Sequence, residues 1–398
     1  MRRIPRLALA AIVVLGIAAA VTAAIAAVGT HVTRESTSEA AASAPTAASV
    51  PGGLLVWMEP PESTSSLGTQ RSDGTIYARV WNAQGEALVS NVTQGVAASL
   101  VTGGEEPVIM TVSYDCRCHF FRLDRDGGAW QEILSLSESP VAVTASASSV
   151  AYTAIDNRET IVARSLDDVS STLRLELPSL DVDKGSSDMV TTGPPVSNPR
   201  SVVATALVAI GENLVAFSGN QTSCQVTDLP SGKTEAVRKG EVNAACAGVD
   251  GNLYAALSGP SKGATLRIVQ IDPATLKVTS TFDTDWTPTP QSAAPRLNKL
   301  RLLATSDGVA LFVSELPQYP DVVAPTHVWV LKNGELSETA SLPMGTGIDA
   351  GYGSDGSLLL FGGIARESVS RLDLTTGKVT AAEQMTSPDK TWVLLAAE

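Results

Sequence analysis

Histidine, cysteine and positive charge are all scarce in this sequence of 398 residues. It has three histidines and four cysteines, and its 28 basic residues are outnumbered by 41 acidic ones. Residues 1–52 hold four of the arginines and two of the glutamates, which leaves residues 53–398 with 24 basic and 39 acidic residues, a formal charge of −15. Nucleic-acid binding needs a cationic surface against phosphates. We therefore expect no nucleic-acid partner, and no contact of this acidic part with anionic lipid.

The few histidines and cysteines also limit the chemistry that the sequence can support. His119 alternates with Phe121 and Leu123, and His327 alternates with Trp329 and Leu331, so both are expected to be strand residues rather than catalytic groups. The cysteines lack the usual spacing of a zinc site. Gly259–Gly263 matches the Gly-x-Ser-x-Gly pattern, but a nucleophile elbow needs a helix after the serine and none is expected here. We predict no catalytic residue, no metal ligand and no cofactor.

The N-terminus differs from the rest of the chain. Arg2, Arg3 and Arg6 (in residues 1–6) precede an uncharged run from Leu7 to Val28, 22 residues that are long enough to cross a bilayer as a helix. Basic residues before such a run favour a cytoplasmic start and an exported C-terminus. We expect a single-pass cell-membrane protein anchored by residues 7–28. The alternative is a cleaved signal peptide and secretion. Residues 29–52, rich in Ser, Thr, Ala and Pro, are expected to be a disordered stalk.

After residue 52 a short unit recurs seven times, with an apolar strand, a tight turn and a second strand. Between Gly85, Gly127, Val169, Gly232, Leu276, Gly334 and Gly377 the steps are 42, 42, 63, 44, 58 and 43 residues. A period of about 40–50 residues built from short strands is typical of a β-propeller. The sequence therefore predicts an all-β, seven-bladed propeller over residues 53–398.

Each blade should hold four antiparallel strands, counted outward from the centre of the ring. The second strands are the clearest, with apolar residues at period two. They are Leu54–Glu59, Val108–Ser113, Val150–Ile155, Leu214–Ser218, Leu253–Ser258, Val309–Ser314 and Leu358–Phe361. Blade one has no innermost strand before Leu54, whereas Lys390–Leu395 forms a strand left over after blade seven. We expect this C-terminal strand to close blade one, since that leaves no open sheet edge.

The turns carry a resemblance to known proteins. Leu372–Val379 resembles the Asp-x-x-Thr-Gly-Lys-Val strand–turn–strand of the seven-bladed YVTN, quinoprotein-like and WD40-like propellers, and residues 227–233 and 271–277 are looser copies. The resemblance covers about residues 53–398 and implies the architecture. The Trp-Asp dipeptide repeat is absent, and no active site of these families can be placed on the sequence.

The connections divide between the two ends of the expected propeller. First-to-second and third-to-fourth strand turns are all short, and we call their end the short-turn face. The other connections include four long loops, at 60–74, 178–200, 284–297 and 316–326, and we call their end the long-loop face. Binding residues tend to lie on such loops. The predicted binding residues on the long-loop face are Trp286, Tyr319, Arg296, Asp285, Asp321, Arg71, Glu62 and Arg158.

The four cysteines would form disulfides if the chain is exported, because their number is even. We predict Cys116–Cys118 and Cys224–Cys246. Cys224 begins a third strand in blade four and Cys246 lies in the first strand of blade five. Buried free thiols and a metal site are the alternatives.

The sequence favours a non-catalytic binding or scaffold propeller, held outside the membrane. Its partner would be another exported or cell-envelope protein, or a small ligand. The alternative is an extracytoplasmic enzyme, such as a hydrolase, a lyase or a quinone-dependent oxidoreductase, because propellers host many functions.

Overall fold

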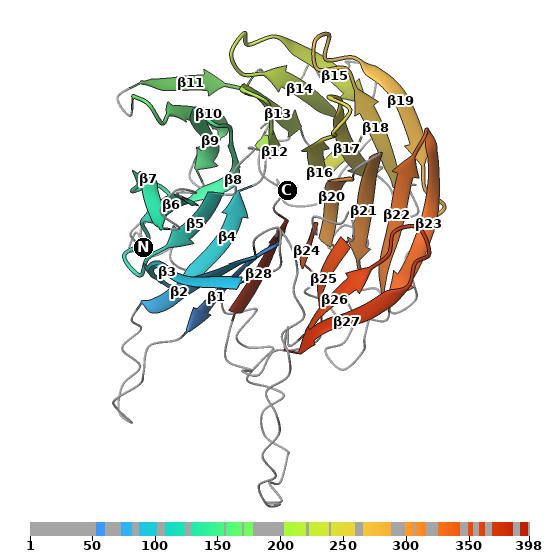
Figure 1. The fold of residues 1–398 in the computed structure, drawn as a ribbon. Coiled ribbons are helices and arrows are strands. Elements are labelled where there is room, and N and C mark those ends of the chain that lie inside the picture. Colours follow the sequence, from blue (N-terminus) through green and yellow to red (C-terminus); the bar gives the residue numbers. More distant parts are fainter. Residues whose placement is uncertain are drawn as a thin grey trace, which may run out of the picture. The chain divides into compact units, whose positions relative to one another are not determined.

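The computed structural model describes most of the part of the chain that follows the predicted stalk. The described residues are 53–59, 73–81, 87–101, 108–123, 129–154, 157–168, 171–177, 203–219, 223–238, 240–258, 266–287, 299–305, 308–315, 325–342, 349–352, 358–362, 368–384 and 391–396. Over these residues the chain is all-β (Figure 1), as predicted. The predicted anchor at 7–28 and stalk at 29–52 lie outside them. Within the described ranges, no helix is long and apolar enough to cross a membrane.

The described strands form seven four-stranded antiparallel sheets, which we number along the chain. Sheet one is β28 (Thr391–Ala396), β1 (Gly53–Glu59), β2 (Gly74–Trp81) and β3 (Ala87–Gly95); sheet two is β4 (Ala97–Val101), β5 (Val108–Val112), β6 (Cys118–Leu123) and β7 (Trp130–Leu136). Sheet three is β8 (Pro140–Ala145), β9 (Ser149–Ala154), β10 (Asn157–Ser165) and β11 (Thr172–Glu176); sheet four is β12 (Val203–Ile210), β13 (Asn213–Gly219), β14 (Cys224–Asp228) and β15 (Thr234–Arg238). Sheet five is β16 (Glu241–Ala247), β17 (Leu253–Ser258), β18 (Arg267–Ile271) and β19 (Val278–Asp283). Sheet six is β20 (Lys299–Thr305), β21 (Gly308–Ser314), β22 (Thr326–Lys332) and β23 (Glu335–Leu342); sheet seven is β24 (Asp349–Tyr352), β25 (Leu358–Gly362), β26 (Ser368–Leu372) and β27 (Val379–Gln384).

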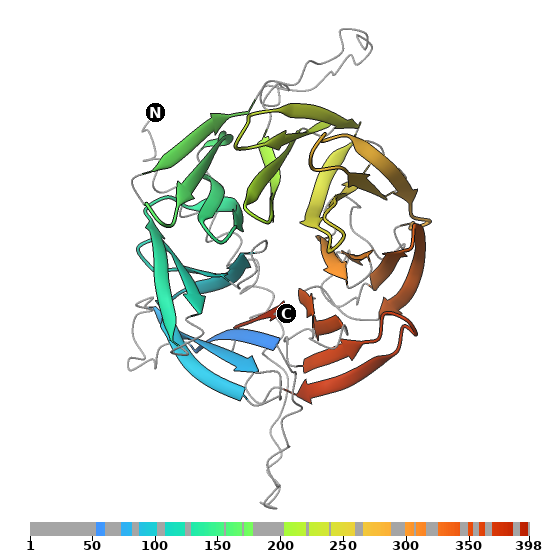
Figure 2. The same cartoon turned by 45° about the horizontal axis from the view of Figure 1, so that its top comes forward.

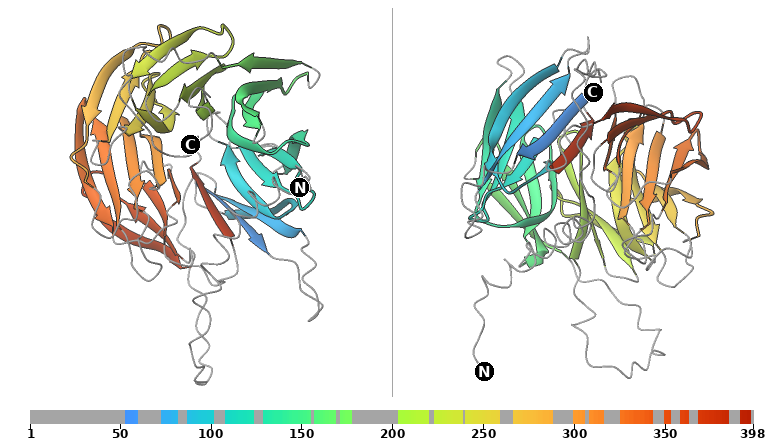
Figure 3. Two further views of the ribbon diagram at one scale, coloured as in Figure 1. Left: turned by 180° about the vertical axis from the view of Figure 1, so that it is seen from behind. Right: turned by 90° about the horizontal axis from the view of Figure 1, so that it is seen from below.

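The sheets follow one another around a common centre (Figure 2), which is the arrangement of a β-propeller. Their innermost strands, β28, β4, β8, β12, β16, β20 and β24, each contact the next, and β24 contacts β28 in turn. The C-terminal strand β28 pairs antiparallel with β1, from Gly53 opposite Ala396 to Met58 opposite Thr391. The two lie side by side in Figure 3. The predicted place of the C-terminal strand in the first sheet is confirmed.

The core lies in layers between neighbouring sheets rather than in one central mass. One layer joins sheets four and five, where Phe217 and Val226 pack against Leu257 and Leu276. Another layer joins sheets five and six, where Ile268 meets residues of β21 and β22 that include Trp329. Similar layers join sheets one and two, two and three, three and four, and six and seven. Each sheet contributes side chains to the layers on both of its sides, because successive side chains of a strand point to opposite faces.

Three outer hairpins share the turn that the sequence motif predicted. Asp228, Asp272 and Asp373 each accept a hydrogen bond from a backbone N–H two or three residues on, at 3.1, 3.0 and 2.8 Å. These bonds hold the turn in shape, as in an Asx turn. The hydroxyl of the following Thr275 and the N–H of Ala274 lower the pKa of Asp272. The N–H groups of the two threonines after it lower the pKa of Asp373.

The same turns place one residue in the left-handed region of backbone conformation. This residue is Gly232 in sheet four, Leu276 in sheet five and Gly377 in sheet seven, with φ of 68°, 63° and 68°. Glycine adopts this conformation without strain, whereas a residue with a Cβ does not. Leu276 is nevertheless 1% exposed and packs in the layer between sheets four and five. The repeat therefore retains a strained backbone at Leu276, where the side chain is needed in the core.

The structure does not contain the two predicted disulfides, Cys116–Cys118 and Cys224–Cys246, because all four cysteines are free. Cys116 is exposed in a turn with φ of 65°, whereas Cys118 is buried in β6, and burial raises the pKa of its thiol to about 11. Cys224 packs in the layer between sheets four and five, but Cys246 packs against the layer between sheets five and six. The second pair thus lies on opposite sides of sheet five.

Candidate functional site

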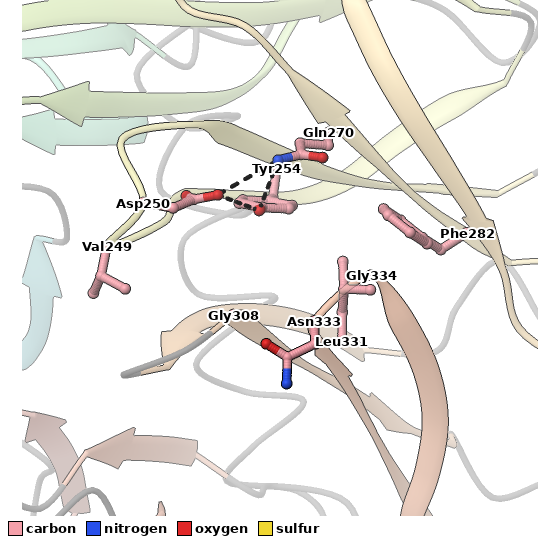
Figure 4. A pocket seen from close by; sticks show the side chains of 9 residues that line it. All are labelled: Val249, Asp250, Tyr254, Gln270, Phe282, Gly308, Leu331, Asn333 and Gly334. Atoms are coloured by element: carbon pink, nitrogen blue, oxygen red, sulfur yellow. Dashed lines mark hydrogen bonds between the residues drawn. The ribbon is translucent and has the colours of Figure 1, made fainter.

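A cavity of about 510 Å³ opens between sheets five and six at the short-turn face (Figure 4). The wall from sheet five comprises the turn between β16 and β17, the start of β17, and the ends of β18 and β19. The wall from sheet six comprises the start of β21, the end of β22 and the turn that follows β22. The lining residues are Val249, Asp250, Tyr254, Gln270, Phe282, Gly308, Leu331, Asn333 and Gly334. Its volume falls within the range of about 300–1,000 Å³ that is usual for small-molecule sites.

The turn that carries Asp250 is tight, and it fixes the position of this side chain. The N–H of Gly251 donates to the carbonyl of Gly248 at 3.0 Å, and Gly251 has a φ of 78°. A Cβ on Gly248 would lie 2.6 Å from both Asp250 Oδ1 and Tyr254 Cε2. Glycine at position 248 therefore allows the carboxylate and the phenol ring to approach each other.

Asp250 is the acceptor at the centre of a small hydrogen-bond network. Its Oδ2 accepts bonds from the Tyr254 hydroxyl and from Asn252 Nδ2, both at 2.7 Å, and a longer bond of 3.4 Å from Gln270 Nε2. Its Oδ1 accepts the backbone N–H of Asn252 at 3.1 Å. Gln270 Nε2 also donates to the Tyr254 hydroxyl at 3.1 Å. These donors fix the side-chain positions on this wall before any ligand arrives.

The network sets the protonation of its members. Burial by itself would raise the pKa of Asp250, but the hydrogen bonds from Asn252 and Tyr254 outweigh it and lower that pKa. Burial and the nearby Asp250 carboxylate raise the pKa of Tyr254. At neutral pH Asp250 is therefore ionised, and Tyr254 keeps its proton and donates a hydrogen bond to the carboxylate.

Both sheets contribute apolar side chains to the lining. Phe282 comes from β19, and Leu331, 3% exposed, comes from the end of β22. Asn333 and Gly334 follow in a two-residue hairpin turn, with φ of 52° and 78°. This is the Asn-Gly type I′ turn, in which both central residues adopt positive φ. It sets the Asn333 amide at the rim of the cavity.

The predicted residues Asp285 and Trp286 lie at the opposite end of the same two sheets. Trp286 is partly buried against the layer between sheets five and six, and its indole N–H donates to Glu315 Oε1 at 3.2 Å. The indole N–H of Trp329 donates to Asp285 Oδ1 at 3.3 Å. Trp286 thus packs onto sheet six at the start of its loop.

Glu315 also faces His327 from the same cluster. Glu315 is fully buried, and its Oε1 lies 3.6 Å from His327 Nε2, while His327 Nδ1 lies 2.8 Å from Glu338 Oε1. The ring centroids of His327 and Trp329 are 5.5 Å apart. The placement of His327 in a strand is confirmed. In the ranges that the structure covers, no three His, Cys, Asp or Glu side chains are arranged to hold a metal ion.

Sheet two repeats part of this arrangement. His119 occupies the second position of β6, as His327 does in β22, and its Nδ1 lies 2.9 Å from Glu132 Oε1. Its ring faces Phe121 two residues on, at a centroid distance of 6.5 Å. A shift in strand register follows the third position of both β6 and β22. The His–Glu pair is therefore a property of the repeated hairpin, which argues for a structural role.

Six further residues complete the predicted binding set. Glu62, Arg71, Arg296, Tyr319 and Asp321 lie outside the described residues, and Arg158 lies in β10 of sheet three. Sequence reasoning missed Asp250, Tyr254 and Gln270, although it identified the turn that holds Asp250 as a short one. No sequence pattern relates Asp250 to Asn333, because the two come together only through the packing of two sheets.

No model of a protein family and no curated protein matches the sequence. Solved structures do resemble the fold. A protein of Bacteroides uniformis, proposed to be a 6-phosphogluconolactonase, is 15% identical, with a TM-score of 0.52 over 86% of this chain and 100% of its own. A second, from Bacteroides fragilis and proposed to have the same activity, is 15% identical, with a TM-score of 0.52 over 86% of this chain and 98% of its own. A protein of Lactobacillus plantarum is 13% identical, with a TM-score of 0.51 over 86% and 99%. At such identities the likeness shows the fold alone.

Proposed function

We propose that this chain is an exported, membrane-anchored protein whose seven sheets are the blades of one closed propeller, and that it binds a partner without catalysing a reaction. The partner is another exported or cell-envelope protein, and it contacts the long-loop face. The uncharged run at 7–28 after three arginines supports the anchor and the export of the propeller. The acidic balance supports a soluble protein surface rather than one that binds nucleic acid.

One observation carries the proposed binding face. Trp286 begins one long loop, Glu315 immediately precedes a second, and His327 follows the second. The three are joined by the Trp286–Glu315 hydrogen bond and by the pair of Glu315 with His327. Two long loops thus start from one rigid base. Binding residues are often carried on loops that a rigid scaffold positions, because less entropy is then lost on binding.

The same cluster supports binding over catalysis. Glu315 faces the indole N–H of Trp286 and the imidazole of His327, and His327 faces Glu338 on its other side. A general base needs a free lone pair within reach of a substrate proton. Glu315 is fully buried, and His327 Nε2 is buried without a hydrogen-bond partner among the described residues, so neither is exposed to a substrate.

An extracytoplasmic enzyme, such as a hydrolase, a lyase or a quinone-dependent oxidoreductase, is the second candidate. Two structural neighbours are proposed to be 6-phosphogluconolactonases. Their likeness to this chain is one of fold, and a fold hosts many functions. Incubating the purified protein with 6-phosphogluconolactone tests this candidate directly. Hydrolysis well above the spontaneous rate would favour the enzyme and contradict the proposal.

Crosslinking in intact cells followed by mass spectrometry tests the binding face. Replacing residues 288–298 or 316–324 by Gly-Ser linkers of equal length should abolish the crosslinks, because the loop side chains that contact the partner are lost. Both replacements keep Trp286, Glu315 and His327. Glu335→Ala, an exposed change on the short-turn face, is the control and should keep the crosslinks. The proposal fails if the crosslinks survive both loop replacements or map to the short-turn face.

A further inference from the structure

We propose that the cavity between sheets five and six is a second binding site, and that its ligand is a small organic cation with an ammonium group beside an apolar body. This site lies at the short-turn face, away from the proposed partner surface. The inference stands whether or not a partner binds the long-loop face.

The charge of the lining points to a cation. Asp250 is the one charged side chain among the nine lining residues, and the hydrogen bonds of Asn252 and Tyr254 keep it ionised. Neither lysine nor arginine belongs to this lining. A carboxylate at the side of a partly enclosed cavity attracts a cation more strongly than one in open water, since the effective dielectric constant is lower.

The hydrogen-bonding groups point to a ligand that donates. Gln270 directs its Nε2 toward Asp250 and Tyr254, so its carboxamide oxygen lies on the side away from that network (Figure 4). The Gln270–Asp250 bond is the longest of the network, at 3.4 Å, and is the one that an incoming ammonium group can replace. Asn333 adds a second carboxamide at the rim. An ammonium group, with three donors and no acceptor, suits these oxygens.

The apolar side chains of the lining define the rest of the ligand. Leu331 of sheet six faces the Asp250 network across the cavity, Phe282 lies beside that network on sheet five (Figure 4), and Val249 at the edge is 66% exposed. An aromatic or branched alkyl group would cover exposed parts of Phe282 and Val249, and burying apolar area is favourable at about 25 cal/mol per Å². A cation without an apolar body would leave these parts exposed.

Tight turns on both rims keep the site open. The β16–β17 turn holds Asp250, and the Asn-Gly turn holds Asn333, each with residues at positive φ. Short turns of this kind have few alternative conformations. Little conformational entropy is lost when a ligand enters such a preorganised site.

Titration calorimetry of the full-length protein with three matched probes tests the proposal. Benzylammonium should bind about tenfold more tightly than neutral benzyl alcohol, because of one favourable charge pair. Benzoate, of similar size and opposite charge, should bind more weakly than either. No binding of benzylammonium, or equal binding of all three probes, would overturn the proposal.

Two variants that change the charge of the cavity lining in opposite directions locate the site. Asp250→Asn should weaken benzylammonium binding about tenfold, whereas Asn333→Asp should strengthen it several-fold by adding a second carboxylate at the rim. Asparagine and aspartate both tolerate positive φ, so Asn333→Asp keeps the β22–β23 turn. This variant therefore tests the site even if Asp250→Asn disturbs the β16–β17 turn. Asp272→Asn, an equal change of charge on an exposed turn of sheet five, should leave binding unchanged. Unchanged binding in the Asn333→Asp protein, or equal weakening by Asp272→Asn, would refute the assignment.

Discussion

Leu276 offers a direct test of how a buried side chain and a strained backbone balance in this propeller. It occupies a turn position where sheets four and seven have Gly232 and Gly377, and it adopts a φ of 63°. A residue with a Cβ pays about 1–2 kcal/mol in this region. Full burial of a leucine contributes about 1.5–3 kcal/mol. Leu276 is 1% exposed, so its burial outweighs the strain.

The prediction concerns the step from alanine to glycine at this position. We expect Leu276→Ala to lower the free energy of unfolding by about 2–5 kcal/mol, because it removes a buried side chain and keeps the strain. Going on to glycine removes a further methyl group, worth about 0.8 kcal/mol, and costs about 0.5–1 kcal/mol of backbone entropy. It also relieves the strain of about 1–2 kcal/mol. Leu276→Gly and Leu276→Ala should therefore be about equally stable.

Leu257 is the matched control. It is fully buried in the same layer between sheets four and five, but it lies in strand β17 with ordinary backbone conformation. There the loss of the methyl group and the entropy cost act together, so Leu257→Gly should be about 1.5 kcal/mol less stable than Leu257→Ala.

Denaturant unfolding of the full-length variants, followed by tryptophan fluorescence, measures both steps if the denaturant slopes are equal. The explanation of Leu276 is refuted if the alanine-to-glycine step costs the same at both positions.

Three further predictions follow from other parts of the structure. Deleting Thr391–Glu398 removes β28 and leaves β1 as an open edge. The deletion should therefore lower the melting temperature and promote aggregation, and unchanged melting would contradict the closure of sheet one. The folded-state pKa values of Asp272 and Asp373 lie below the usual 3.8, so their contribution is present above that pH and is lost as pH falls through the lowered values. The wild-type melting temperature should therefore fall below about pH 4, and less steeply in the Asp272→Asn, Asp373→Asn protein; equal slopes would be the contrary result. Of the four free thiols, only exposed Cys116 should react rapidly with a thiol reagent at pH 8 in the native protein, because Cys118 is buried with a pKa of about 11. If all four cysteines stayed unreactive in denaturant, the protein would contain disulfides instead.

Local features of the sequence were enough to predict the strands and their turns. The period-two alternation of Leu253–Ser258 matches β17 residue for residue, and the Asp-x-x-Thr-Gly-Lys turn at Asp373 has the conformation that its glycine indicates. The place of the C-terminal strand also followed, because an unpaired strand at 390–395 and a first sheet lacking a strand have one economical solution. These inferences depend on contacts between residues close in sequence, or on a count of strands.

The sites depended on tertiary structure. Asp250 and Asn333 are 83 residues apart in the sequence, and they line one cavity only because sheets five and six pack side by side. Cys224 and Cys246 belong to neighbouring sheets, yet alternation along their strands turns them to different layers. Trp286 packs against sheet six because Glu315, which follows β21, accepts its indole N–H. Repeated strands look alike in sequence, and only their packing decides which side chains meet.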